Sequence, residues 1–516
     1  MRKWMPLIAV CLGTFMLLVD VTIVTVALPD MAVDLKTTFS SLQWVVDIYT
    51  LVLAALLLAM GSVADLYGRR RLYLGGLVVF ALASLASGLA QNTTLLIAAR
   101  GLQGIGGAAM YATTIALLSS SYQGRDRGVA FGIWGAVSGA AAAAGPILGG
   151  LLTQNLSWRW IFFVNLPVSV AALAASRWSL AADRPAGRAR PDVAGLLTFT
   201  VGAAAVTYGL IRAAAHGWGS AATLSLLGVG LAAFAAFILV ELARQRAGAG
   251  VLLDLALFRR PAFCGVMIAA LLLNAAAFAY LPYTSVWLQT VLRLTPIRAG
   301  LVGSAPLSLA AFVVSALIGR FLHNHSPRWI IGGGLALIGA GVLLQATLTA
   351  QSGDLVLLPG LIVAGIGVGL ATPPLVSSAM SAVPQHSAGM AAGAVNTARQ
   401  LGFTFGVAVL GGVFSSRVAG VLGDPALAPA VTGGQARAVL AHAPAAHRPA
   451  LDQLIHAATA SGLNHALVVA GVLGLAAALV TVVTMRRSVP PPGSGQATPA
   501  GRQAAQATAT PEPAER

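Results

Sequence analysis

The chain has few charged residues for its length. Only 9% of its 516 residues are Asp, Glu, Lys or Arg, whereas 57% are hydrophobic and the mean hydropathy is +0.83. A soluble protein of ordinary composition carries about 25% charged residues. The composition therefore excludes a chain that is mostly soluble, and it indicates that membrane lipid covers most of its surface.

Residue types that carry chemistry are also scarce. Cys11 and Cys264 lie in separate apolar runs, so neither a disulfide framework nor a metal site is expected. His442, His447 and His456 are spaced by five and nine residues, which does not place two ligands on one helix face. No nucleophile–base pair or metal cluster stands out. We therefore expect no enzyme, no catalytic residue, no metal and no cofactor other than a proton gradient.

The basic residues are distributed by membrane topology. Of 31 Lys and Arg, 21 fall at the termini and in the even-numbered connections between apolar runs, eight fall in the opposite connections, and Arg100 and Arg399 lie inside runs. Short cytoplasmic connections concentrate Lys and Arg. We therefore expect a multi-pass protein of the cell inner (cytoplasmic) membrane with both termini cytoplasmic. The net charge of +16 does not indicate a nucleic-acid partner.

Fourteen apolar runs are each long enough to cross a bilayer, which takes about 20 residues. The first contains Asp20 and is longer than the run of a signal peptide, so it is read as a retained span. The runs lie at about 5–28, 43–64, 72–90, 94–119, 127–152, 160–180, 193–212, 222–243, 262–284, 299–319, 329–350, 355–376, 388–414 and 464–485.

These runs predict an all-α integral membrane protein in four parts. Residues 1–180 form an N-terminal six-helix bundle, and 181–245 form a linker and two additional transmembrane helices. Residues 246–487 form a C-terminal six-helix bundle with a long outer loop at 415–463. Residues 488–516 are rich in Pro, Ala, Gly and Gln and predict a disordered cytoplasmic tail.

A glycine- and arginine-rich string joins the second and third runs. It reads Gly61-Ser-Val-Ala-Asp65-Leu-Tyr-Gly68-Arg69-Arg70-Arg71. Gly61 and Gly68 permit close helix approach and a sharp turn. Asp65 can accept hydrogen bonds from backbone N–H groups at a helix N-terminus, where the helix dipole favours an anion. The alternative is a loop anchored by its arginines alone, and the combined spacing favours a conformational latch.

Ionisable groups inside apolar spans are costly and mark function by default. Asp20, Asp47 and Arg100 all lie in the outer halves of their spans, so they could share one electrostatic site. Burial raises the pKa of a carboxyl group and a nearby guanidinium lowers it, so such a carboxyl can exchange protons near neutral pH. A static ion pair is the alternative for Asp20 and Arg100, and simple solvation near the interface is the alternative for Asp47.

Two further groups of residues are candidates. In the fifth span, Gly145, Pro146 and Gly149 combine small residues that let helices touch with a proline that kinks the span; ordinary packing is the alternative. Polar and aromatic side chains in the ninth and thirteenth spans could line a substrate cavity, although Tyr and Trp near span ends are also interfacial anchors. They are Asn274, Tyr283, Gln289, Asn396 and Arg399.

Several motifs then occur in one order along the chain. They are Asp20 in span one, the Gly61–Arg71 string, Arg100-Gly-Leu-Gln103-Gly104, Gly145-Pro146, Ser157-Trp-Arg-Trp160-Ile-Phe-Phe-Val-Asn165-Leu-Pro167, Ala388-Gly389 and Arg399-Gln400-Leu-Gly402. With them, the chain resembles the fourteen-spanning drug:proton antiporters of the major facilitator superfamily, the EmrB/QacA type, over about residues 5–485.

This resemblance implies the major facilitator fold and a set of residue roles. Asp20 and Arg100 would join proton coupling. Asp65, with Arg69 and Arg70, would steady one state of alternating access, and the Gly145-Pro146 helix would be the bend associated with antiport. The expected function is proton-coupled efflux of small amphipathic compounds by a monomer in membrane lipid.

Alternatives remain open from the sequence alone. Because interior acids are few, the substrates are expected to be neutral, zwitterionic or singly charged. The chain could instead export one endogenous metabolite or antibiotic. A membrane sensor that transports nothing is disfavoured by the absence of a folded soluble output domain.

Overall fold

The computed structural model describes residues 2–37, 39–181, 192–321, 326–383, 387–424 and 427–485. Within these ranges the chain is helical and contains no β-strand. The predicted tail 488–516 and most of the predicted linker, residues 182–191, lie outside the described residues. A chain of apolar runs folds into helices because lipid offers no hydrogen-bond partner to an exposed backbone.

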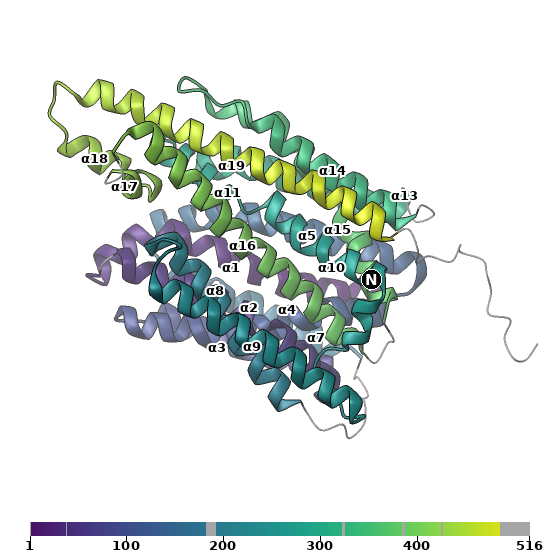
Figure 1. The fold of residues 1–516 in the computed structure, drawn as a ribbon. Helices are drawn as coiled ribbons and strands as arrows, with labels where there is room; N and C mark the ends of the chain where they lie inside the picture. Colours follow the sequence, from purple (N-terminus) through teal and green to yellow (C-terminus); the bar gives the residue numbers. More distant parts are fainter. Residues whose placement is uncertain are drawn as a thin grey trace, which may run out of the picture.

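The first half of the chain forms long, roughly parallel helices (Figure 1). Their bounds are α1 Met5–Asp34, α2 Phe39–Tyr67, α3 Arg69–Gly88, α4 Thr93–Ser121, α5 Gly124–Asn155, α6 Trp160–Phe163, α7 Asn165–Ser179, α8 Val193–His216 and α9 Ala221–Arg246. Asn92 and Asp192 begin α4 and α8 by accepting hydrogen bonds from Leu95 N and Gly195 N, each at 2.8 Å. Both are ordinary N-caps.

The second half is more broken. Its helices are α10 Pro261–Ala277, α11 Leu281–Val286, α12 Pro296–Gly303, α13 Ala305–Phe321, α14 Pro327–Gln345, α15 Leu358–Ser381, α16 Ala388–Leu422, α17 Ala428–Thr432, α18 Ala436–His442 and α19 Arg448–Thr484. A π-helical turn, η3 Trp287–Val291, follows α11, and α12 meets α13 at an angle of 48°.

Each of the fourteen predicted runs coincides with one or two of these helices. Twelve helices of the described chain are long and apolar enough to cross a membrane, and the bent pair α12 and α13 makes thirteen. The count of fourteen is not confirmed, because α5 is 32 residues long but falls outside this set.

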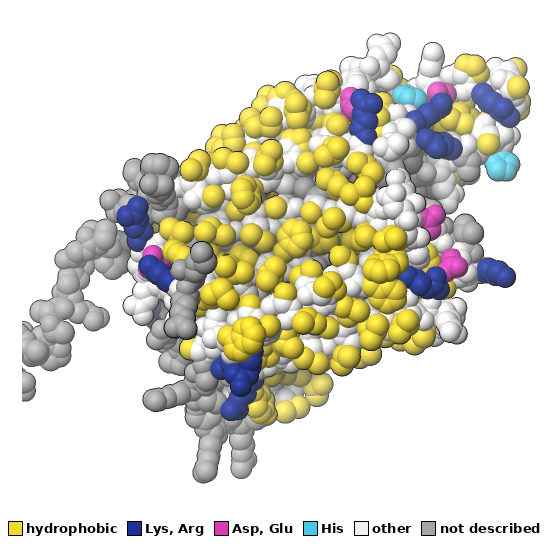
Figure 2. Space-filling view, turned by 180° about the vertical axis from the view of Figure 1, so that it is seen from behind, with side chains coloured by type: hydrophobic (Ala, Val, Ile, Leu, Met, Phe, Trp, Pro, Cys, Tyr) yellow, Lys and Arg dark blue, Asp and Glu magenta, His cyan; other side chains and the backbone are white. Residues whose placement is uncertain are grey.

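The surface agrees with a membrane-spanning bundle. Figure 2 shows hydrophobic side chains covering the middle of one face, with charged side chains gathered toward its two ends. One end, here called the arginine end, carries Gly68 and Arg69–Arg71 between α2 and α3. The other, here called the far end, carries α17 and α18 (Figure 1).

The far end corrects one expected boundary. The sequence predicts a long outer loop at 415–463. Instead, α16 continues to Leu422 and α19 begins at Arg448, so residues 423–447 connect them and contain the short helices α17 and α18. A 35-residue and a 37-residue helix therefore extend past the apolar runs that predicted them.

Small residues set the closest helix contacts. The helices of the first half pack against those of the second chiefly where α2 meets α16 and α5 meets α13, while α8 and α9 pack on each other beside α2 and α16. A Cβ on Gly61 would lie 2.5 Å from the carbonyl oxygen of Gly389, and one on Gly132 would lie 2.5 Å from that of Ser315. No larger residue fits at either crossing, which is typical of helix contacts in membranes.

Substitution of a glycine at such a contact should destabilise the protein. A Cβ on Gly402 would lie 1.9 Å from the Leu271 carbonyl oxygen on α10, whereas Gly333 on α14 has open space around it. We expect Gly402→Ala to cost at least ~1–3 kcal/mol through overpacking and to lower the melting temperature in detergent. Gly333→Ala is the matched control, because alanine favours the helix. Equal melting temperatures for the two variants would contradict the packing seen here.

Candidate functional site

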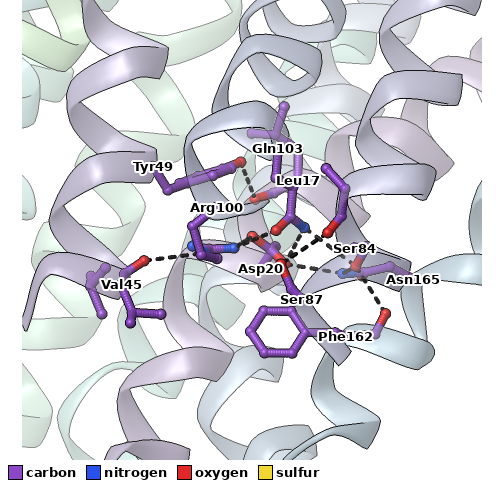
Figure 3. Close-up of polar contacts among 12 residues, drawn as sticks. Leu17, Asp20, Val45, Tyr49, Ser84, Ser87, Arg100, Gln103, Phe162 and Asn165 are labelled. Carbon is purple, nitrogen blue, oxygen red and sulfur yellow. Dashed lines mark hydrogen bonds and ion pairs between the residues drawn. The ribbon is translucent and has the colours of Figure 1, made fainter. Parts of the chain in front are cut away.

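The most deeply buried charges form one ion pair. Asp20 on α1 and Arg100 on α4 are both fully buried, and Arg100 Nη1 donates to Asp20 Oδ2 (Figure 3). Arg100 also donates through Nε to the Val45 carbonyl at 3.0 Å and through Nη1 to Gln103 Oε1 at 2.8 Å. The pair therefore joins α1, α2 and α4 inside the first half.

Neutral amides complete the coordination of Asp20. Its Oδ1 accepts hydrogen bonds from Gln103 Nε2 at 2.9 Å and Asn165 Nδ2 at 3.0 Å. Asn165 also donates to Ser84 Oγ at 3.0 Å, and Ser84 donates to the Phe162 carbonyl at 2.9 Å (Figure 3). Three donors thus face one carboxylate, and all three stabilise its ionised form.

An aromatic ring closes the pair on the side of α2. The Arg100 guanidinium carbon lies 4.3 Å from the centroid of the Tyr49 ring, and the Tyr49 hydroxyl donates to the Leu17 carbonyl at 3.5 Å. Stacking of this kind shields a cation from water while retaining some electrostatic stabilisation. The Asp20 carboxylate has no exposed surface.

Sequence reasoning found the two charges and missed most of their partners. Gln103 lies three residues after Arg100, a spacing that places both side chains on one helix face. Asn165 is an amide inside an apolar run, which is a signal of the same kind. Ser84 and Tyr49 carry no such signal, because a serine or a tyrosine in a span is common.

Asp47 does not join this pair. It is half-buried on α2, and its backbone carbonyl accepts from Thr50 Oγ1 at 3.0 Å. Its carboxylate makes no ion pair with any residue that the structure describes. The structure therefore brings together two of the three residues expected to share a site.

Asp65 contacts the other half of the protein. Its Oδ1 accepts from Gly389 N at 3.0 Å and its Oδ2 from Met390 N at 2.8 Å, so the carboxylate caps the N-terminus of α16. Arg69 donates to Oδ1 at 2.9 Å. An anion at a helix N-terminus is stabilised by both the free N–H groups and the helix dipole. This contact closes the arginine end between α2 and α16.

The glycines of the same string allow that contact. Gly61 lies against Gly389, as described above, so α2 and α16 touch at their backbones. Gly68 has φ = 101° and ψ = 129°, a conformation that glycine adopts without strain, and it separates α2 from α3. Arg70 donates to the Arg177 carbonyl at 2.6 Å, which ties the string to the end of α7.

A strap of residues 247–254 reaches the same crossing from α9. Ser62 Oγ donates to the Leu252 carbonyl at 2.9 Å, and Asp254 N donates to Met390 Sδ at 3.3 Å. The strap is held to α9 by Leu252 N, which donates to buried Glu241 at 3.2 Å. The additional helix pair α8 and α9 is thereby connected to the α2–α16 contact.

The antiport-helix residues lie between the halves. A Cβ on Gly145 would lie 1.8 Å from Thr22 Oγ1, so α5 presses directly on α1, and Gly149 is buried on the same helix. The helix runs unbroken through position 146. The side chain of Pro146 lies outside what the structure describes.

Of the five expected cavity residues, two line one small cavity. Asn274 on α10 and Arg399 on α16 border it together with Thr372 on α15. Asn396 is fully buried and donates to the Tyr111 carbonyl on α4 at 2.9 Å, so it bridges the halves. Tyr283 and Gln289 do not line the cavity. Tyr283 donates to the Val407 carbonyl at 2.6 Å, and Gln289 donates to Ser285 Oγ at 2.7 Å.

Comparison with known proteins fits this arrangement. A model of the Major Facilitator Superfamily matches residues 10–407. The chain belongs to the major facilitator superfamily. It is 36% identical to the multidrug resistance protein Stp of Mycobacterium tuberculosis (strain CDC 1551 / Oshkosh) over 85% of this chain and 80% of that protein. It is 37% identical to the puromycin resistance protein pur8 of Streptomyces alboniger over 84% and 86%.

A solved structure agrees at the level of the fold. The human organic anion transporter MFSD10 (TETRAN) superposes with a TM-score of 0.61 over 93% of this chain and 99% of that one, at 15% identity. This facilitator is accordingly a multi-span helical membrane transporter and not an enzyme. Its relatives named for drug resistance support the resemblance to the drug:proton antiporters.

At the far end of this facilitator a separate polar contact joins α1 to the residues before α6. Asp34 at the end of α1 accepts from Arg159 at 2.5 Å and from Trp158 Nε1 at 2.9 Å. These two hydrogen bonds hold the pKa of Asp34 below its usual range. The Ser157–Trp160 motif thus ties α1 to the start of α6.

The buried pair should show strong coupling in stability measurements. Asp20→Asn leaves the Arg100 charge without a counter-ion, and Arg100→Gln leaves the Asp20 carboxylate without one. We expect each single change to cost ~3–5 kcal/mol, whereas the double variant, which is neutral at both positions, should recover much of that loss. Melting temperature in detergent would measure the effect. Asp126→Asn, which removes an exposed pair with Lys3, is the control with an expected effect below ~1 kcal/mol. Additive losses at Asp20 and Arg100 would contradict a coupled pair.

Proposed function

We propose that this facilitator exports small amphipathic drugs or antibiotics across the cytoplasmic membrane, driven by proton entry through alternating access. The proposal rests on the fully buried ion pair of Asp20 and Arg100, in which the Asp20 carboxylate is the acidic group. Relatives named for multidrug and puromycin resistance support the substrate class.

In this proposal Asp20 carries the proton. Arginine stays charged throughout, so Arg100 can hold Asp20 ionised while the network is closed. When the far end opens, water reaches the carboxylate, protonation breaks its bond to Arg100, and the contacts among α1, α2, α4 and α7 loosen. One proton crossing 100 mV yields ~2.3 kcal/mol, which sustains a substrate gradient of roughly fifty-fold.

The Asp65 contact acts as the latch of the opposite gate. Placing both termini and the arginine end in the cytoplasm follows from the distribution of Lys and Arg. The cap of Asp65 on α16 then holds the cytoplasmic side closed while the outer side cycles. Two six-helix bundles would rock around the contacts of α2 with α16 and α5 with α13, with α8 and α9 as an added pair. A monomer contains all of these parts.

A second candidate is export of one compound only. The puromycin resistance protein is named for a single antibiotic. Growth protection against one compound but not against a panel of unrelated dyes would favour this narrower function.

A charge-neutral double variant tests proton coupling separately from protein folding. In everted vesicles, the wild type should move a fluorescent substrate against its gradient, and a protonophore should abolish this. The double variant Asp20→Asn, Arg100→Gln is expected to be folded and to bind substrate, but to lose proton-driven accumulation by at least about tenfold, since no carboxyl remains to load. Full proton-driven transport by the double variant would overturn the role of Asp20. A wild type that moves no compound would overturn export itself.

The latch predicts a change in accessibility. Asp65→Asn weakens two charge-assisted hydrogen bonds to Gly389 and Met390. At ~1.5–3 kcal/mol for such bonds, the closed gate should open on the order of tenfold more often. The measurement is the rate at which a maleimide labels Thr397→Cys, a buried position on α16, from the arginine side in a background without Cys11 and Cys264. Asp126→Asn is the control at the same end. An unchanged labelling rate for Asp65→Asn would contradict the latch.

A further inference from the structure

Arg100 and Arg399 both lie well inside membrane-spanning helices of this chain and have opposite surroundings. Arg100 faces a carboxylate, a carbonyl and an amide. Arg399 forms no ion pair with any described residue, and its Nη1 is buried without a hydrogen-bond partner in that part of the chain. Its guanidinium carbon lies 5.7 Å from the centroid of the Trp134 ring on α5, near the outer limit of about 6 Å for a cation–π contact.

The depth of Arg399 in the membrane makes its unpaired charge costly in free energy if the residue has only a structural role. It lies ten residues after Gly389, roughly 15 Å along α16 from the latch at 1.5 Å per residue. A cation at that depth is stabilised only by a partner, because neither lipid nor apolar side chains solvate it. The ring of Trp134 supplies part of this, and no acid lines the space beside it. The missing partner is an anion.

The other polar groups beside Arg399 match an anion as well. Thr372 on α15 has a buried hydroxyl that makes no hydrogen bond within the described chain. Asn274 on α10 uses one amide hydrogen on the Ala270 carbonyl at 3.2 Å and keeps a second. Guanidinium, hydroxyl and amide donors therefore border one cavity without a carboxylate among them, and a planar guanidinium fits two oxygen atoms at once.

The remaining lining is apolar. Ala270, Leu273, Leu375 and Val376 complete the wall of a small void that has no room for a water molecule. Drug-sized ligands need about 300–1,000 Å³, so this closed form holds only the beginning of a site. The void lies between α10, α15 and α16. Arg399 at its edge also faces the Trp134 ring of the first half, so rocking of the halves would enlarge the space around Arg399.

We propose that Arg399, with Thr372 and Asn274, forms a subsite for the ionised acidic group of an amphipathic substrate, a carboxylate or an acidic phenol or enol, whose apolar body extends toward Trp134. The inference rests on the proposed export function and specifies its substrate class. It also explains selectivity: a cationic amphiphile would meet an uncompensated positive charge in a medium of low dielectric constant.

A matched pair of probes tests the subsite. The probes are a naphthyl carboxylic acid with an alkyl tail and its methyl ester, which differ in one charge. Binding to the purified full-length protein is measured by quenching of tryptophan fluorescence at pH 7. The wild type should bind the acid at least about tenfold more tightly than the ester. Arg399→Gln should remove that preference without weakening the ester, and Arg399→Lys should retain part of it.

Controls separate recognition from folding. Arg417→Gln removes an exposed arginine from the same helix and should leave both affinities unchanged. If Arg399→Gln fails to fold, Thr372→Ala provides a milder variant that should weaken the acid more than the ester. Equal losses for the two probes, or an unchanged preference in Arg399→Gln, would overturn the subsite.

Transport in proteoliposomes then distinguishes the two proposals. If the wild type binds with the expected preference but exports neither probe under a proton gradient, export is wrong and the subsite stands. If it exports both probes equally and Arg399→Gln changes neither rate, the subsite is wrong and export stands.

Discussion

A buried carboxylate that must be stabilised organises the first half of this protein. Asp20 cannot remain ionised among apolar helices without donors, and those donors come from two other helices: Arg100 and Gln103 on α4 and Asn165 at the start of α7. Arg100 in turn requires the Val45 carbonyl on α2. Four helices are thus held in register by one negative charge. Loss of that charge would remove the contacts that hold these four helices together.

Direct contact between the backbones of neighbouring helices is the second constraint on the structure. Where α2 meets α16, glycines on both helices let a carboxylate from one reach the N–H groups at the start of the other. A side chain at Gly61 or Gly389 would move the helices apart and break the cap. The small residues are therefore what makes the electrostatic contact possible. The same relation holds for α5, whose glycines bring α1 and α13 to its two sides.

The sequence predicted those features that depend on the composition of a local segment. Apolar runs predicted where the helices lie, since a span is a matter of length and hydropathy. Asp20 and Arg100 stood out because charge in such runs is rare, and Asp65 stood out by its spacing from the glycines and arginines of the Gly61–Arg71 string. Partners were harder to predict, because a contact such as Ser84 with Asn165 depends on the packing of distant helices. The ends of α16 and α19 were missed for another reason: beyond the apolar run, a helix continues on tertiary contacts and leaves no hydropathy signal. Tyr283 contacts the Val407 carbonyl and does not border the small void beside Arg399, and a tyrosine at a span end can serve a packing contact as readily as a cavity.

The additional helices α8 and α9 are connected to the conformational cycle by more than proximity. Arg244 on α9 pairs with Asp192 at 3.1 Å and donates to the Gly250 carbonyl, while Glu241 receives Leu252 N. These contacts fix the strap that reaches Ser62 on α2 and Met390 on α16. Met390 is the residue whose backbone N–H the latch carboxylate holds. Separation of α2 from α16 must therefore either stretch the strap or carry α9 with it. The helix pair α8 and α9 thus reaches the α2–α16 contact through polar contacts rather than through apolar packing alone.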